Sequence, residues 1–118
     1  MKRFESDRKS TFIDLYNKLI NDVESGELTF TGMPLQRHHI IPKSVRPDLV
    51  HDPDNIISLP IREHALMHYW LWKHDRSYAP QFWFCLNHAR KNHIFDITHQ
   101  EYEQLRKDIL STKRQKLC

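Results

Sequence analysis

The feature that most constrains the fold is one interruption in an otherwise helical pattern of apolar residues. Between Leu35 and Leu59 lie two short β-branched segments, "LQRHHIIP" and "NIISL", separated by the Pro- and Asp-rich run "KSVRPDLVHDPDN". The two segments are typical of short strands, and the run between them is typical of a loop. Pro42 lacks the backbone N–H that a central strand would need, so we expect the first strand to be short.

Helical segments flank this region. Apolar residues recur at helical spacing over about residues 11–25, where Ser10 or Thr11 can cap the start and Gly26 can end the helix. A second helix is expected from about Pro60 to His74, where no internal Gly or Pro occurs.

Further helices are expected over about residues 80–112. Thr98 and Glu101 match a capping box at the start of the last one. The aromatic residues of "QFWFCL" are expected in the core, together with a buried Cys85. The sequence therefore predicts a single α+β domain over residues 1–118, mostly helical, around a strand-strand-helix core at about residues 35–75 that contains a short antiparallel hairpin.

Composition narrows the class of protein without deciding its function. The chain of 118 residues is 39% hydrophobic and carries a formal charge of +3, which permits a nucleic-acid partner but does not require one. Cys85 and Cys118 form no CxxC pair, which excludes a four-cysteine zinc site. No apolar run approaches the roughly 20 residues of a membrane span, and the polar N-terminus has no hydrophobic signal region. We therefore expect a cytoplasmic protein with no membrane partner.

The histidines carry the chemical information. His38 and His39 are neighbours on a predicted strand, so their side chains point to opposite faces and suit two different tasks. His64 and His68 are four residues apart on a predicted helix, so they lie one turn apart on one face and can hold one metal ion. Alone, such a pair also fits two ordinary histidines on a half-buried face. If the hairpin folds back on the helix, one histidine of the doublet joins the pair and leaves open coordination positions, as in catalytic metal sites.

In their order and spacing, "RHHIIPKS" and "DPDNIISLPIREHALMH" resemble the HNH nuclease motif, also called the ββα-metal or His-Me finger motif. The resemblance covers about residues 37–74 and is to HNH endonucleases of the phage and homing type, although His38 as the first ligand is nearer to the bacterial-toxin members. It implies that His38, His64 and His68 are metal ligands. It also implies that His39 is the general base and that Asn55 fixes the hairpin and holds the base in place.

The implied activity is hydrolysis of DNA phosphodiester bonds, with one divalent ion stabilising the phosphate and the leaving group. Imidazole at neutral pH is suited to taking a proton from water. Zn, Mn, Ni, Co and Mg all remain open as the metal. The expected substrate is double-stranded DNA, cut by a monomer or a homodimer in a bacterial or phage-infected cell. Basic residues near the motif are candidate phosphate contacts: Arg37, Lys43, Arg46 and Arg62.

Three alternatives stay open. One is a protein-interaction domain in which the histidines bind no metal. The same site would serve an RNase or a toxin nuclease. A DNA-binding module with a structural metal and no catalysis would also carry these histidines, although such a site has no need of a general base.

Overall fold

A computed structural model describes the backbone of residues 1–116 and the side chains of residues 1–112. Over these residues the chain forms four α-helices, one two-stranded antiparallel sheet and three short 3₁₀ turns. In chain order these are α1 (Thr11–Glu24), β1 (Gln36–His39), η1 (Pro47–Leu49), η2 (Pro53–Asn55), β2 (Ile56–Leu59), α2 (Ile61–His74), η3 (Arg76–Tyr78), α3 (Ala79–Lys91) and α4 (His99–Lys116). A small, mostly helical α+β fold is therefore confirmed.

The chain divides into two compact units, residues 1–60 and residues from Ile61 onward, and each is described by itself. The expectation of a single domain stays a prediction. None of the helices within residues 1–116 is both long enough and apolar enough to cross a lipid bilayer.

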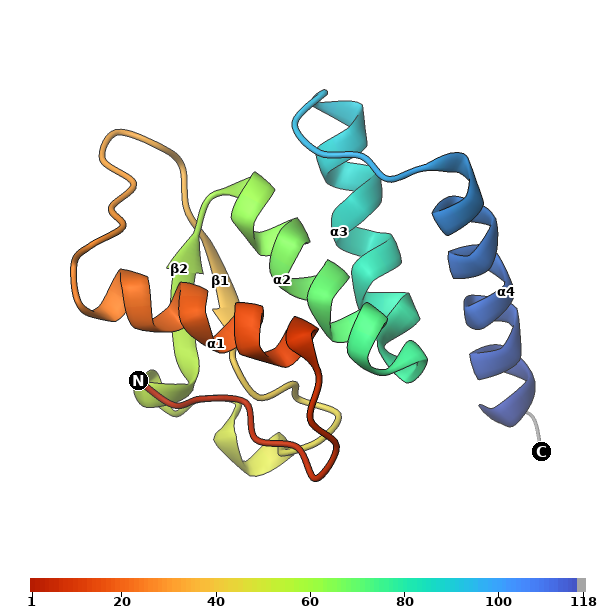
Figure 1. Cartoon of the computed structure of the whole chain (residues 1–118), viewed down its shortest axis with the longest axis horizontal. Coiled ribbons are helices and arrows are strands. Elements are labelled where there is room, and N and C mark those ends of the chain that lie inside the picture. Colours follow the sequence, from red (N-terminus) through yellow and green to blue (C-terminus); the bar gives the residue numbers. More distant parts are fainter. Residues whose placement is uncertain (117–118) are drawn as a thin grey trace. The chain divides into compact units, whose positions relative to one another are not determined.

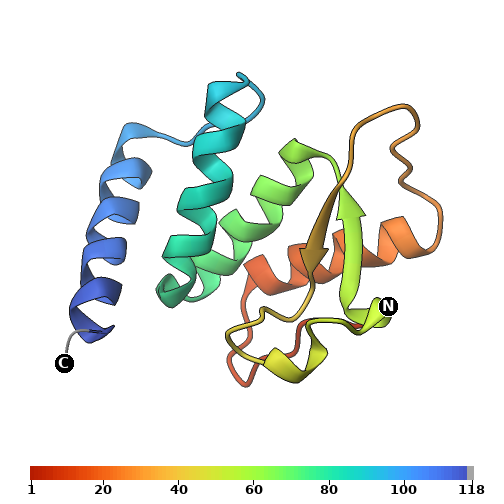
Figure 2. The same ribbon diagram turned by 180° about the vertical axis from the view of Figure 1, so that it is seen from behind.

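In the first unit, helix α1 lies across one face of the hairpin, as the two opposite views in Figures 1 and 2 show. The Ser10 hydroxyl accepts a hydrogen bond from the Ile13 N–H at 3.3 Å, so the predicted N-cap is confirmed. Gly26, with a φ of 82°, follows the helix end. The buried face of α1 consists of Ile13, Tyr16 and Ile20.

The hairpin is short and its register is fixed. Gln36 pairs with Leu59, Arg37 with Ser58, His38 with Ile57, and His39 with Ile56. Strand β1 ends at His39, before the two isoleucines that the sequence pattern includes in the strand. The region between the strands is the expected loop, and it also contains the turns η1 and η2, each of which begins with a proline.

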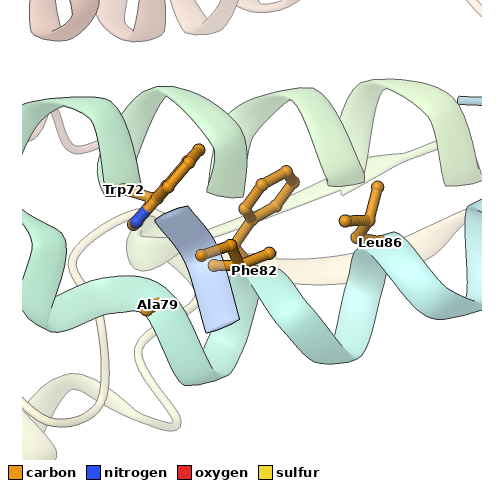
Figure 3. Close-up of a cluster of buried hydrophobic side chains, with 5 residues drawn as sticks. Trp72, Ala79, Phe82 and Leu86 are labelled. Carbon is orange, nitrogen blue, oxygen red and sulfur yellow. The ribbon is translucent and has the colours of Figure 1, made fainter. Parts of the chain in front are cut away.

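In the second unit, helices α2, α3 and α4 enclose an apolar core. Figure 3 shows Trp72 of α2 beside Phe82 of α3, with Leu86 farther along α3. The Trp72 and Phe82 rings are stacked, with centroids 5.4 Å apart. Trp72 also donates its indole N–H to an Asp108 carboxylate oxygen of α4 at 2.7 Å, which satisfies the polar atom of a nearly buried side chain.

The start of α4 has the predicted capping box. The Thr98 hydroxyl accepts from the Glu101 N–H at 3.1 Å, and the Glu101 carboxylate accepts from the Thr98 N–H at 3.3 Å. The helix continues to Lys116, beyond the expected end near residue 112.

Two expectations about α3 are wrong. Phe84 is 80% exposed rather than part of the core, because the five successive apolar residues 82–86 cannot all lie on one helix face. Cys85 is half-buried rather than fully buried.

Candidate metal centre

Strand β1 places the side chains of His38 and His39 on opposite faces. His38 is 1% exposed on the face that also buries Ile57 and Leu59 of the partner strand. His39 is partly exposed on the other face, two residues from the exposed Arg37. The two neighbouring imidazoles therefore have different surroundings.

His38 is held by a tyrosine from helix α1. The Tyr16 hydroxyl oxygen lies 2.6 Å from His38 Nε2, and the same hydroxyl donates to the Ile40 carbonyl at 2.7 Å. The two rings meet edge to face, with centroids 5.8 Å apart. Tyr16 is fully buried, so this arrangement is part of the core of the first unit.

His39 is held by the backbone of the loop. Its Nε2 lies 3.0 Å from the Val50 carbonyl oxygen. A carbonyl only accepts hydrogen bonds, so Nε2 carries the proton and donates it. In the neutral ring the lone pair is then on Nδ1, which is the atom available as a base.

The side chain of Asn55 holds the loop that contains the Val50 carbonyl. Its side-chain oxygen accepts from the Ile41 N–H at 2.9 Å, and its side-chain nitrogen donates to the Ile41 carbonyl at 3.1 Å. A longer contact of 3.5 Å joins the same nitrogen to the Leu49 carbonyl, next to Val50. Asn55 is fully buried, so its amide replaces strand pairing where the hairpin opens into the loop.

In the second unit, His64 and His68 form a close pair on one face of α2. Their Nε2 atoms are 3.2 Å apart. Two imidazole nitrogens that bind one ion at about 2.1 Å are about 3.0–3.4 Å apart for coordination angles near 90–109°. The separation therefore fits a shared metal ion, and it also fits a hydrogen bond from one ring to the other.

Burial keeps both rings of this pair neutral. It lowers the pKa of His64 to about 4. It lowers the pKa of His68 to about 3, with a smaller contribution from the neighbouring His64. A metal ligand must be the neutral imidazole, so at neutral pH the pair is in the form that binds metal.

Among the described residues, His38 of the first unit and the pair His64 and His68 of the second each offer a ring nitrogen as a possible metal ligand. The residue types alone do not identify the metal.

The four basic candidates differ in their surroundings. Arg46 forms a two-point ion pair with Asp48, at 2.9 and 2.7 Å. Arg62 lies 3.4 Å from the Glu63 carboxylate. Arg37 and Lys43 are exposed and make no ion pair with another described residue, so their charges are available to an outside anion.

Sequence reasoning missed two groups that hold the histidines. Tyr16 was expected only as part of the apolar face of α1, and nothing in its spacing indicates the partner of its hydroxyl. The Val50 carbonyl is a backbone group in a loop, for which the sequence carries no signal.

The second unit holds a close pair of neutral imidazoles, and the first unit holds two neighbouring imidazoles in different surroundings. Comparisons with protein-family models, with curated proteins and with solved structures give no match for this chain. The resemblance to HNH nucleases therefore stays a prediction.

Proposed function

We propose that this chain is a metal-dependent DNA endonuclease of the HNH type, in which His39 is the general base. The supporting observation is the asymmetry of the doublet. His38 is buried and bonded to Tyr16, whereas His39 is partly exposed and oriented by the Val50 carbonyl. A structural metal site needs ligands, but it has no use for an oriented and accessible imidazole beside them.

In this proposal His39 acts through Nδ1. It takes a proton from a water molecule, and the water oxygen attacks phosphorus in line with the O3′ leaving group. The bond between phosphorus and O3′ breaks, and the departing alkoxide takes a proton from solvent. The products are a 5′-phosphate and a 3′-hydroxyl. The Val50 carbonyl keeps its hydrogen bond to Nε2 and so stabilises the imidazolium that forms.

The metal ligands in the proposal are His38, His64 and His68. The fit rests on the neutral, closely spaced pair on α2 and on an all-imidazole donor set, which favours Zn, Ni, Co or Mn, with Mg as a further possibility. When bound, a divalent ion supplies charge stabilisation to the phosphoryl oxygens and to the leaving group.

The proposed substrate is double-stranded DNA. Arg37 is on the same strand face as His39, and together with Lys43 it offers an unpaired cation for backbone phosphates. Arg46 and Arg62 contribute less in this proposal, because each already faces a carboxylate.

The test is plasmid cleavage by wild type, His39→Ala and His88→Ala, each with Mn²⁺, Zn²⁺, Ni²⁺, Co²⁺ or Mg²⁺ and each with EDTA. His88 is an exposed histidine on α3 and serves as the matched control. We expect wild type and His88→Ala to cut equally, EDTA to abolish cutting, and His39→Ala to lose about 10²–10⁴-fold in rate. Equal cutting by His39→Ala would refute the assigned base.

The same experiment separates the rival functions. Duplex binding and metal binding without cleavage of DNA or RNA would favour a binding module with a structural metal. Cleavage of RNA but not of DNA would favour a ribonuclease that uses the same residues.

A further inference from the structure

We infer that Tyr16 is a positioning residue for the metal site, because it fixes which nitrogen of His38 carries the lone pair. The inference rests on the proposed role of His38 as a metal ligand. It adds a residue from outside the hairpin and the helix α2, and it assigns the ligating atom as His38 Nδ1.

The Tyr16 hydroxyl contacts both the Ile40 carbonyl oxygen and His38 Nε2. A phenol has one proton to donate, and its oxygen can also accept. The Ile40 carbonyl, 2.7 Å away, can only accept, so the hydroxyl proton is used there. The contact of 2.6 Å between the same oxygen and His38 Nε2 must then be donated by the histidine.

This assigns the tautomer of His38. Nε2 carries the proton, and in the neutral ring the lone pair is on Nδ1. A metal-binding histidine commonly donates its other ring N–H to an oxygen acceptor, which orients the ring and raises its basicity. The Tyr16 oxygen is such an acceptor.

The hydroxyl has little freedom to adopt another arrangement. Tyr16 and Ile40 are both 0% exposed and His38 is 1% exposed, so water does not compete for these bonds. The Tyr16 ring is also held edge to face by Phe4, with centroids 6.0 Å apart. Tyr16 of α1 therefore places a firmly held acceptor, its hydroxyl oxygen, against the buried face of β1.

Removing the hydroxyl should weaken metal binding without removing a ligand. In Tyr16→Phe, the His38 ring loses the hydroxyl acceptor that selects Nε2–H, so both neutral tautomers should be populated. Substitutions of this kind of supporting residue weaken metal affinity by about 10–100-fold. His39 keeps its bond to the Val50 carbonyl in this variant.

Two measurements on the full chain test the inference. The first is the nitrogen chemical shifts of the His38 ring in isotope-labelled, metal-free protein, which report directly on which nitrogen is protonated. We expect Nε2–H in wild type and a mixture of tautomers in Tyr16→Phe. The second is titration with Co²⁺ or Zn²⁺ of wild type, Tyr16→Phe, His38→Ala and the control Tyr78→Phe, which removes the hydroxyl of a buried tyrosine in the second unit.

The outcomes distinguish this inference from the proposed function. If wild type binds no metal, or if His38→Ala binds as tightly as wild type, the metal site itself is wrong. If His38→Ala loses metal but Tyr16→Phe binds as tightly as Tyr78→Phe, the role of Tyr16 is refuted. A proton on Nδ1 of His38 in wild type would refute it as well, and that result needs no variant to fold.

Discussion

Replacing Asn55 tests the link between the hairpin and the proposed base. In Asn55→Ala the fully buried amide is lost, and with it the two bonds of 2.9 and 3.1 Å to the Ile41 backbone. Each such bond contributes about 1 kcal/mol net, and a buried backbone group left without a partner costs about 1–3 kcal/mol more. Ile41 is only partly buried, so water can replace some of what is lost. We expect a loss of about 2–4 kcal/mol in the free energy of unfolding.

Asn55→Asp sharpens the test because it keeps the size of the side chain. One carboxylate oxygen still accepts from the Ile41 N–H, but the other faces the Ile41 carbonyl, to which the amide donates in wild type. Protonating that oxygen would restore a donor, so the folded protein should raise the pKa of the new carboxyl above its unfolded value of about 3.9. The folded state then binds more protons in that window. The deficit of Asn55→Asp relative to wild type should therefore grow as the pH rises.

The assay is urea denaturation of wild type, Asn55→Ala, Asn55→Asp and Asn92→Ala at pH 5 and pH 7.5. Asn92 provides the control, because it is exposed and its side chain makes one bond, to the His88 carbonyl at 2.8 Å. Asn92→Ala should change stability by no more than about 0.5 kcal/mol. If Asn55→Ala is no more destabilised than Asn92→Ala, the amide does not hold the loop. The proposed support of the Val50 carbonyl, and through it of His39, would then be wrong as well.

Three further outcomes are expected. Metal-free protein should lose stability as the pH falls from about 6.5 toward 4, because His64 and His68 take up protons in the unfolded chain but resist protonation when buried. Urea denaturation in EDTA measures this dependence, and a free energy of unfolding that does not change over this range would contradict it. His68→Gln should reduce the slope. A metal at about 100 times its Kd should add about 2.7 kcal/mol to the stability of wild type and nothing to that of His68→Gln, measured as a shift in Tm that EDTA reverses. Leu86→Ala should lower the free energy of unfolding by about 2–5 kcal/mol because Leu86 is fully buried, whereas Phe84→Ala should lower it little. Thermal denaturation of both variants measures the difference, and equal destabilisation would contradict the packing of α3.

Much of the fold follows from local sequence. Two helix caps are examples, the capping box of Thr98 with Glu101 and the cap at Ser10. Each depends on a contact between residues three apart, so both partners are visible in the local sequence. Strand β1 is shorter than its apolar pattern for a non-local reason. The Ile41 N–H is bonded to the Asn55 side chain, fourteen residues away, rather than to a backbone carbonyl of a partner strand.

For the candidate site, the sequence predicts residue types and faces but not the atoms that act. Strand alternation alone separates His38 from His39, and helical spacing alone pairs His64 with His68. Neither pattern says which ring nitrogen carries a proton. That depends on acceptors supplied from elsewhere in the chain: a tyrosine from α1 and a loop carbonyl at Val50.

The Tyr16 hydroxyl and the Val50 carbonyl place His38 and His39 in the same neutral tautomer. In both rings Nε2 donates a hydrogen bond, so in both the lone pair is on Nδ1, although one acceptor is a buried phenol and the other a partly exposed backbone carbonyl. Because the strand turns neighbouring side chains to opposite faces, the two rings lie on opposite faces of β1. Burial then separates their uses: the buried His38 suits a metal ion, and the partly exposed His39 suits proton transfer with a water molecule. A substitution that changes the acceptor of one ring should therefore alter metal affinity or proton transfer, but not both.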